Sequence, residues 1–326
     1  IKLLKWVAAG LALIILAVVL FVYVPGERTF DAPYPDLAAS QDSAIIARGK
    51  YLAFGAAHCV SCHAPMDKFE ELENGLQMPL MGGWELDIPP GSFRAPNLTP
   101  DMETGIGKFT DGELARALRY SVKHDGKPLF PFMPFQEISD EDLVAIISFL
   151  RSQEPVKTNI QPSEYSFLGR ALYAFGVVKP EAPRNTPPNW VNIDSTVEYG
   201  NYIANSVGNC FGCHTARSLK TGEFYGEPFA GGTLFPEDPL SHGYSFVSPN
   251  LTPHKTDGVI ALWDESTFVN RFRAGRTRVG SPMPWGAFSR LDEMELKALY
   301  RYLQSIEAVP GKVEKTVYAS GETLPG

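Results

Sequence analysis

The sequence has few cysteines, no excess of positive charge and no long hydrophobic run after its first segment. Only four cysteines occur among 326 residues, and 29 lysines and arginines face 37 aspartates and glutamates, a formal charge of −8. Nucleic-acid binding needs a basic surface, so this balance argues against a nucleic-acid partner. Glycine and proline together stay below the share typical of disordered or collagen-like chains. A length of 326 residues allows two globular domains.

One uncharged run, Trp6–Val24, is long enough to cross a bilayer, at about 28 Å for a helix. Lys2 and Lys5 precede it, so the remainder of the chain should lie outside the cytoplasm. The sequence therefore predicts a transmembrane anchor over 1–26 and a linker over 27–41. The alternative is a cleaved signal peptide, whose apolar core is normally shorter and ends at a small-residue cleavage site. Because the first residue is isoleucine, we expect the natural chain to begin upstream.

The remaining sequence contains an internal repeat. Each half holds a cysteine pair followed by histidine, and further matching features keep nearly the same spacing. These are Gly49 and Gly200, Tyr51 and Tyr202, Gly82-Gly83 and Gly231-Gly232, Pro96–Pro100 and Pro249–Pro253, and Met133-Pro134-Phe135 and Met283-Pro284-Trp285. Such a series indicates duplicated domains. We expect them at 42–155 and 191–310, with a proline-rich linker at 156–190 and an extended tail at 311–326.

The periodicity predicts an all-α fold. Ser139 and Ser289, each with aspartate three residues later, are expected to open equivalent helices. Further helices are expected from Thr110 and Asp264, and before each cysteine pair, at 42–55 and 194–207. The loops between them show no β alternation and are long enough to require a large cofactor in the middle. The apolar segment 165–178 predicts a short packed helix or, alternatively, a contact with the membrane surface or a partner.

The two cysteine motifs, Cys59–His63 and Cys210–His214, match C-x-x-C-H, the attachment pattern of c-type haem. Two thiols one helical turn apart can reach the two vinyl groups on one edge of the ring, and the following imidazole can then ligate the iron. We therefore expect two covalently bound haem c groups. Cys59, Cys62, Cys210 and Cys213 would bind them, with His63 and His214 as proximal ligands. A four-cysteine zinc site and a thioredoxin-type pair are the rival interpretations.

Each iron needs a sixth ligand, and two methionines recur at matching positions. Met133 and Met283 both precede proline and an aromatic residue, so they are the predicted distal ligands. His124 is the alternative to Met133. Carbonyls at or near Pro96 and Pro249 are candidates to accept the proximal imidazole N–H. Arg119 and Arg273 are candidates to pair with haem propionates, the alternative being a solvated helix face.

With these residues, the chain resembles the membrane-anchored dihaem c-type cytochromes of bacteria over about 42–310. Each half is similar to a class I cytochrome c domain. The string PNLTPD-x₃-GIGKFTDGELARALR, followed by MPF, is close to that of cytochrome subunits of membrane-bound alcohol and aldehyde dehydrogenases. Those subunits typically carry three haem motifs, whereas this chain has two. The resemblance implies an N-terminal transmembrane helix followed by two tandem cytochrome c domains.

Two filled sixth positions predict electron transfer rather than catalysis. We expect a single-pass protein of the bacterial inner membrane, with both haem domains in the periplasm. It would relay single electrons between a membrane respiratory or photosynthetic redox complex and another carrier, such as a soluble periplasmic cytochrome or dehydrogenase. Small residues of the anchor, including Gly10, would let other membrane helices approach. The alternatives are a haem subunit of a membrane-bound dehydrogenase, a dihaem peroxidase and, least favoured, a haem-based sensor.

Overall fold

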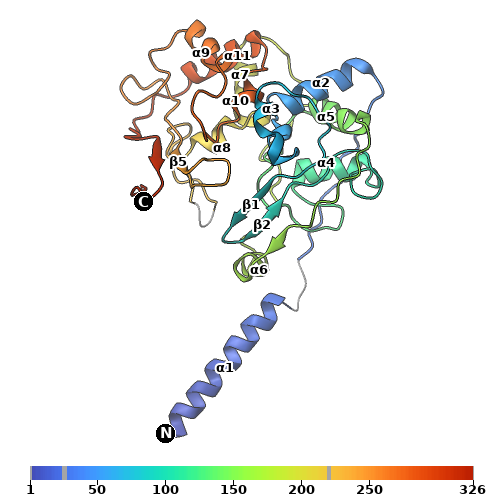
Figure 1. Cartoon of the computed structure of the whole chain (residues 1–326), viewed down its shortest axis with the longest axis vertical. Helices are drawn as coiled ribbons and strands as arrows, with labels where there is room; N and C mark the ends of the chain where they lie inside the picture. Colours follow the sequence, from blue (N-terminus) through green and yellow to red (C-terminus); the bar gives the residue numbers. More distant parts are fainter. Residues whose placement is uncertain (1, 24–27, 219–221, 326) are drawn as a thin grey trace.

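Helix α1 (Lys2–Tyr23) extends away from the rest of the chain as a separate rod (Figure 1). The computed structural model describes residues 2–23, 28–218 and 222–325. Val22 is the one buried residue of α1, and the helix is long and apolar enough to cross a membrane. A helix of this kind near the N-terminus fits either an anchor or a signal sequence. The predicted linker is described from residue 28 onward.

The first half of the body contains three main helices and a small sheet. A turn of 3₁₀ helix, Cys59–Ser61, carries the first cysteine motif, and a second, Met66–Lys68, follows it. The regular elements are α2 (Ser43–Phe54), α3 (Phe69–Glu73), β1 (Glu85–Ile88), β2 (Gly91–Arg94), α4 (Asp111–Tyr120), α5 (Asp140–Ser152), β3 (Glu164–Tyr165) and α6 (Phe167–Ala174). The caps at Asp42, Thr110 and Ser139 confirm the helix starts expected there.

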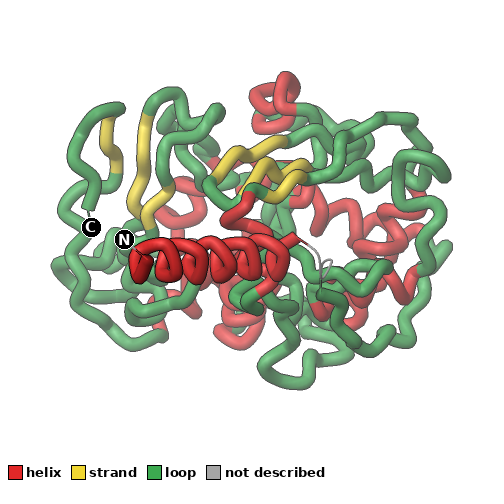
Figure 2. The backbone as a smooth tube through the Cα atoms, turned by 90° about the horizontal axis from the view of Figure 1, so that it is seen from below, coloured by secondary structure: helices red, strands yellow, loops and turns green. Residues whose placement is uncertain are grey.

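The second half repeats this order. Its elements are α7 (Val197–Tyr202), continued by a π-helical turn at Ile203–Val207, then α8 (Cys210–His214), β4 (Leu234–Phe235), β5 (Tyr244–Val247), α9 (Glu265–Arg273), α10 (Trp285–Phe288), α11 (Glu293–Ser305) and β6 (Val317–Ala319). Thr196 caps α7 and Asp264 caps α9. Much of both halves is loop, wound around these few helices (Figure 2).

The all-α expectation is wrong in one respect, because each half also contains a three-stranded antiparallel sheet. The strand orders are β1-β2-β3 and β4-β5-β6. The third strand follows α5 in the first half and α11 in the second, in segments that were expected to be linker and tail. Strands of two to four residues are too short for alternation to be recognised in the sequence.

Ser289 does not open the last helix, contrary to expectation. It lies at the C-terminal end of α10, where its Oγ donates to the carbonyl of Gly286 at 2.9 Å. Helix α11 begins at Glu293, with Asp292, three residues after Ser289, in the N-cap position. The structural counterpart of Ser139 is therefore Asp292, and the counterpart of Asp142 is Glu295.

Two glycines explain how the helices pack within each half. Gly49 lies where α2 meets α5, and a Cβ there would stand 1.8 Å from the carbonyl oxygen of Ala145. Gly200 lies where α7 meets α11, and its Cβ would stand 2.0 Å from the carbonyl oxygen of Ala298. Only glycine allows the helices to approach this closely, which accounts for its recurrence ten residues before each cysteine pair.

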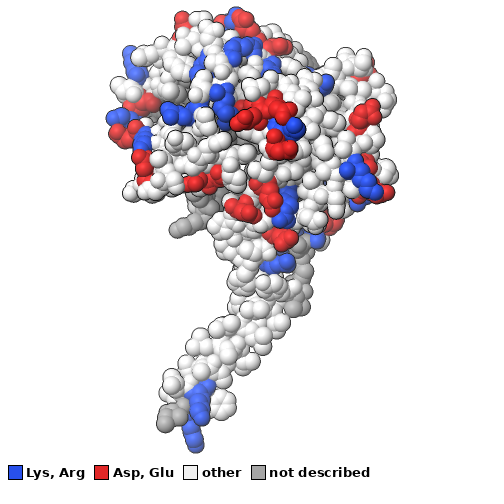
Figure 3. Space-filling view, viewed as in Figure 1, with Lys and Arg blue, Asp and Glu red and all other residues white. Residues whose placement is uncertain are grey.

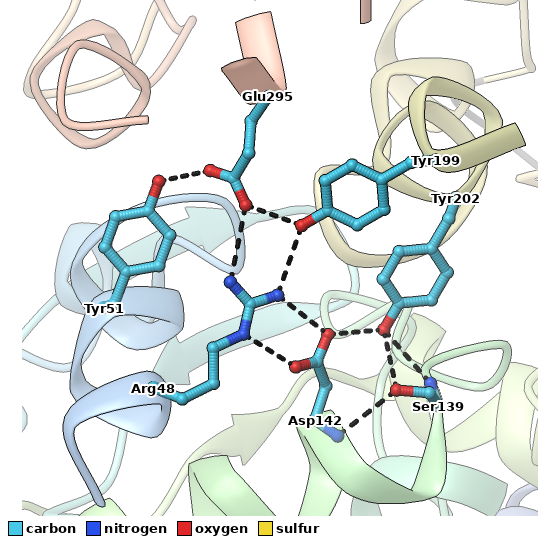
Figure 4. A network of polar contacts seen from close by, with 7 residues as sticks. All are labelled: Arg48, Tyr51, Ser139, Asp142, Tyr199, Tyr202 and Glu295. Atoms are coloured by element: carbon cyan, nitrogen blue, oxygen red, sulfur yellow. Dashed lines mark hydrogen bonds and ion pairs between the residues drawn. The ribbon is translucent and has the colours of Figure 1, made fainter. Parts of the chain in front are cut away.

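The halves meet through a buried polar network (Figure 4). The Arg48 guanidinium lies between two buried carboxylates, 2.9 Å from Asp142 of its own half and 3.4 Å from Glu295 of the other. The Tyr199 hydroxyl donates to Glu295 at 2.6 Å and accepts from Arg48 at 3.3 Å. The carboxylate of Asp142 raises the effective pKa of Arg48 despite the opposing effect of burial. This cation is thus held charged between the two halves.

Apolar packing also crosses this interface. The buried apolar side chains form one continuous core that includes Leu52 and Leu143 of the first half and Leu296 and Leu303 of the second. At its edge Arg276 pairs with Glu73 at 2.8 Å, and Arg290 donates to the carbonyl of Phe54 at 2.9 Å. The described parts of the two halves therefore pack together around a shared core rather than forming two separate domains.

Candidate cofactor sites

The first cysteine motif is wound as a single helical turn. His58 precedes it in the left-handed region, with φ of 37°, and the amides of Cys62 and His63 both donate to the carbonyl of Cys59, at 3.2 and 2.9 Å. The second motif forms α8, and Asn209 precedes it with φ of 46°. The sequence prediction that the two cysteines of each motif lie one turn apart is therefore matched by the backbone.

His63 and His214, the predicted proximal ligands, are buried and held in one tautomer. The Nδ1 of His63 lies 2.9 Å from the carbonyl oxygen of Pro96, and the Nδ1 of His214 lies 2.9 Å from that of Pro249. Because a carbonyl can only accept, each Nδ1 carries the proton, which leaves Nε2 with a free lone pair for a metal. Burial lowers the pKa of both imidazoles, so both are neutral, as a metal ligand must be.

A Gly-Gly pair is hydrogen-bonded to the backbone of each of these histidines. The amide of Gly82 donates to the carbonyl of His63 at 3.0 Å, and the amide of Gly231 donates to that of His214 at 2.8 Å. Both have positive φ, and a Cβ at Gly82 would stand 2.7 Å from the backbone of Pro96. The repeated Gly-Gly therefore lets one loop press against the segment that orients the histidine.

The repeated PNLTP string has a structural role. The side chain of Asn97 accepts from the amide of Thr99 at 2.9 Å and donates to the carbonyl of Val156 at 2.7 Å. Asn250 does the same with Thr252 at 2.8 Å and with the carbonyl of Val309 at 3.0 Å. Each asparagine ties the histidine-orienting segment to the chain just after the last helix of its half.

None of the four cysteines forms a disulfide. Burial raises the pKa of Cys59 to about 12 and of Cys62 to about 11, and raises the pKa of Cys210 to about 12. No group of three or more His, Cys, Asp or Glu side chains with metal-binding geometry occurs among the described residues. The donor set therefore does not fit a four-cysteine zinc site. Two half-buried thiols beside a neutral imidazole in each half fit covalent haem instead.

Met133 and Met283 are half-buried and pack against the core. The chain around both is held in place, since Gln136 donates to the carbonyl of Met133 at 3.3 Å and Arg276 donates to that of Met283 at 3.2 Å. His124, the alternative ligand, is exposed and lies against the ring of Phe109, with centroids 4.4 Å apart.

The two arginines suggested as partners of haem propionates both bond backbone carbonyls of the chain. Arg119 is 3% exposed, and its guanidinium bonds the carbonyls of Gln136 and Ile138 and the carboxylate of Asp140, the last at 2.7 Å. Arg273 donates to the carbonyl of Ser289. Both therefore hold the segment that follows the repeated methionine, a role that neither sequence interpretation included.

The interface network left little signal in the sequence. Tyr51 and Tyr202 stood out only because they recur eight residues before each cysteine pair. Arg48 and Tyr199 occupy equivalent positions with different residues, so the repeat gave no signal for them.

Residues 46–154 match the protein-family model described as Cytochrome c. This part of the chain belongs to the cytochrome c family. It contains Cys59, Cys62, His63 and Met133, so the cytochrome c domain includes the first predicted site. Two C-x-x-C motifs are consistent with covalently bound haem c.

Similar proteins include cytochrome subunits and a dihaem cytochrome. The chain is 29% identical over 286 residues to the cytochrome c subunit of a quinone alcohol dehydrogenase from Gluconobacter oxydans, covering 84% of this chain and 57% of that one. It is 26% identical to the cytochrome subunit of fructose dehydrogenase from Gluconobacter japonicus, covering 92% and 58%. A dihaem c-type cytochrome of Cereibacter sphaeroides is 27% identical, covering 92% and 98%. This cytochrome thus spans less than two thirds of the dehydrogenase subunits but nearly the whole dihaem protein.

Proposed function

We propose that this cytochrome is a membrane-anchored dihaem protein that relays single electrons on the periplasmic side of the inner membrane. It would connect a membrane redox complex with another carrier. The observation that supports this most strongly is the repeated proximal site: in both halves a C-x-x-C-H turn places a buried histidine 2.9 Å from a prolyl carbonyl. When bound, haem c supplies an iron that accepts and gives up one electron.

The proposal assigns the same roles in both halves. Cys59 and Cys62 hold the first haem, with His63 and Met133 as iron ligands. Cys210, Cys213, His214 and Met283 do the same in the second half, which the alignment with a dihaem protein over its full length supports. We place two cytochrome c domains at 42–155 and 191–310, each extended by the third strand of its sheet, and the anchor at 1–26.

The residues of this chain orient the iron ligands and provide the points of haem attachment. The prolyl carbonyls fix the tautomer and direction of each imidazole, burial favours its neutral form, and the cysteine thiols supply the two points of attachment. A methionine ligand favours the reduced iron and raises its potential, while a filled sixth position leaves no place for a substrate. These features favour a relay over a peroxidase, which requires an open iron.

Optical and redox spectroscopy of the full chain in detergent tests the proposal. We expect two low-spin c-type haems, a sulfur-to-iron charge-transfer band in the oxidised protein, and two one-electron transitions on titration. A high-spin haem at rest, or steady turnover of peroxide, would overturn the relay in favour of an enzyme.

A second candidate is a haem subunit of a dehydrogenase complex, favoured by the alcohol and fructose dehydrogenase relatives. Extraction of membranes in mild detergent separates the two. Co-purification with a substrate-oxidising subunit supports the dehydrogenase role. Co-purification with a respiratory or photosynthetic complex supports the relay between that complex and another carrier.

A further inference from the structure

Helix α6 lies beside the end of α1, where α1 joins the body (Figure 1). The ring of Phe175, just after α6, is 5.3 Å from that of Phe21, and the ring of Phe167 is 6.1 Å from that of Tyr23. The guanidinium of Arg170 lies 5.4 Å above the Tyr23 ring. The last turn of α1 and the segment between the two haem-binding halves therefore form one packed unit.

This segment exposes four large apolar side chains, which we call the α6 patch. Phe167, Leu168, Phe175 and Val177 are 48%, 47%, 61% and 48% exposed. They lie within eleven residues of each other and next to the outermost turn of α1. Exposed apolar groups gathered in this way mark an interaction surface.

The α6 patch is rigidly attached to the first half. The hydroxyls of Tyr165 and Tyr173 are 2.8 Å apart, and the Tyr165 ring lies 5.5 Å from that of Phe93 on β2. Ser166 caps α6 and donates through Oγ to the carbonyl of Pro89 at 2.7 Å. The segment is therefore a fixed platform rather than a loose linker.

The position of α1 determines what this platform faces. Twenty-two helical residues span about 33 Å, so an α1 that crosses a bilayer brings Tyr23 to the far interface. Phe175, in contact with Phe21, would then stand at the depth of the outermost apolar turn. Figure 3 shows an uncharged stem between the lysines at the far end of α1 and the charged residues at the base of the body.

Charged residues flank the α6 patch in the arrangement expected at a headgroup layer. The guanidinium of Arg28 lies against Gly176, 3.0 Å from where a Cβ would stand, and Arg170 and Lys179 are close by in the sequence. Basic side chains at this level can pair with lipid phosphates. The acidic residues Asp31 and Glu181 are exposed in the same region, so the attraction is local rather than a broad basic field.

We propose that the α6 patch inserts into the outer leaflet of the lipid bilayer and fixes the tilt of the haem domains on the membrane. This rests on the proposed anchoring by α1. Phe93 also lies 5.3 Å from Phe132, the residue before Met133. The platform thus holds the methionine loop of the first domain at a set height above the lipid, which gives a membrane partner a defined approach to that domain.

Nitroxide labelling of the full haem-loaded chain in a nanodisc tests this inference. The four native cysteines are consumed by haem attachment, so a cysteine introduced as Phe175→Cys is the one reactive thiol. Leu262→Cys, at an 84% exposed position near α9 and remote from α1, is the matched control. Leu13→Cys, within α1, reports on the anchor itself.

We expect the label at 175 to be accessible to oxygen and shielded from a water-soluble nickel complex, with an accessibility ratio several-fold above that at 262. Equal nickel accessibility at positions 175 and 262 would overturn the insertion of the α6 patch into lipid. Shielding of the label at 175 from both oxygen and nickel would also overturn it, because that result indicates that another protein covers the patch. If the label at position 13 reports lipid while the label at position 175 reports water, the α6 patch does not insert into the bilayer, although α1 still anchors the chain. If the label at position 13 also reports water, both the membrane anchor and the insertion of the α6 patch are wrong.

Discussion

Tyr51 and Tyr202 make equivalent pairs of hydrogen bonds across the interface between the two halves. Tyr51 bonds to the second half and Tyr202 bonds to the first. The Tyr51 hydroxyl donates to Glu295 of α11 and accepts from the amide of Asp292 at 2.7 Å. The Tyr202 hydroxyl donates to Asp142 of α5 at 2.8 Å and accepts from the amide of Ser139 at 3.1 Å. Each tyrosine thus caps the last helix of the other half. This reciprocity gives the two predicted haem sites a fixed relationship.

Removing these hydroxyls should uncouple the halves. Tyr51→Phe or Tyr202→Phe leaves a buried carboxylate short of a donor, at a cost of about 1–3 kcal/mol in the free energy of unfolding. We expect the wild-type chain to unfold in one denaturant transition and the double variant to show two. Tyr300→Phe is the control, because its hydroxyl bonds the carbonyl of Trp263 within the second half. Two transitions already present in the wild type would contradict this coupling.

The same tyrosines predict sensitivity to alkaline pH. Burial and the nearby carboxylates raise the pKa of Tyr51, Tyr199 and Tyr202 above the ordinary value of 10. A raised folded-state pKa means that their stabilising effect is complete below pH 10 and is lost as the pH rises further. The free energy of unfolding should therefore fall between pH 9 and pH 11 more steeply in the wild type than in the Tyr51→Phe, Tyr202→Phe variant. Parallel falls would show that these hydroxyls titrate alike in the folded and the unfolded chain.

Replacing a distal ligand should alter only its own haem. Met133→Ala or Met283→Ala removes a ligand that favours the reduced iron, so that haem's potential should fall. The opened position should also bind one carbon monoxide per reduced chain, measured by optical titration. Met102→Ala, at a 64% exposed methionine, is the control and should change neither property. Unchanged potential and carbon monoxide binding in both ligand variants would show that the irons use other ligands.

Gly82→Ala should damage the first site more than an ordinary strained glycine substitution. Gly82 and Gly321 have similar φ, 76° and 82°, so alanine costs about 1–2 kcal/mol of backbone strain at either. At Gly82 the new Cβ also meets the backbone of Ala95 and Pro96 at 2.7 Å, whereas at Gly321 nothing lies within 4 Å. We expect lower stability and an altered haem spectrum for Gly82→Ala alone, measured by denaturation and optical absorption. Equal effects of the two variants would refute the role given to this close approach.

The local geometry of the cysteine motifs and of several helix starts was predictable because its signals are short-range. A C-x-x-C-H motif carries its own spacing, and Ser139 with Asp142 predicted the start of α5 correctly. Ser289 and Asp292 show the same pattern, yet the additional turn of α10 moves the helix start to Asp292. The sheets and the Arg48 network depend on pairing between distant segments. No local pattern could reveal that Arg48 would meet Glu295, 247 residues away in the chain.

The central claim is that each half binds one covalent haem with a histidine and a methionine on its iron. Intact mass of the denatured full chain tests it most directly, combined with the oxidised optical spectrum of the same native sample. We expect a mass increase of two haems in the wild type. The increase should fall to one haem in the Cys59→Ala, Cys62→Ala variant and in the Cys210→Ala, Cys213→Ala variant, with a sulfur-to-iron band retained from the remaining site. A wild-type mass with one haem or none, or no sulfur-to-iron band, would contradict it.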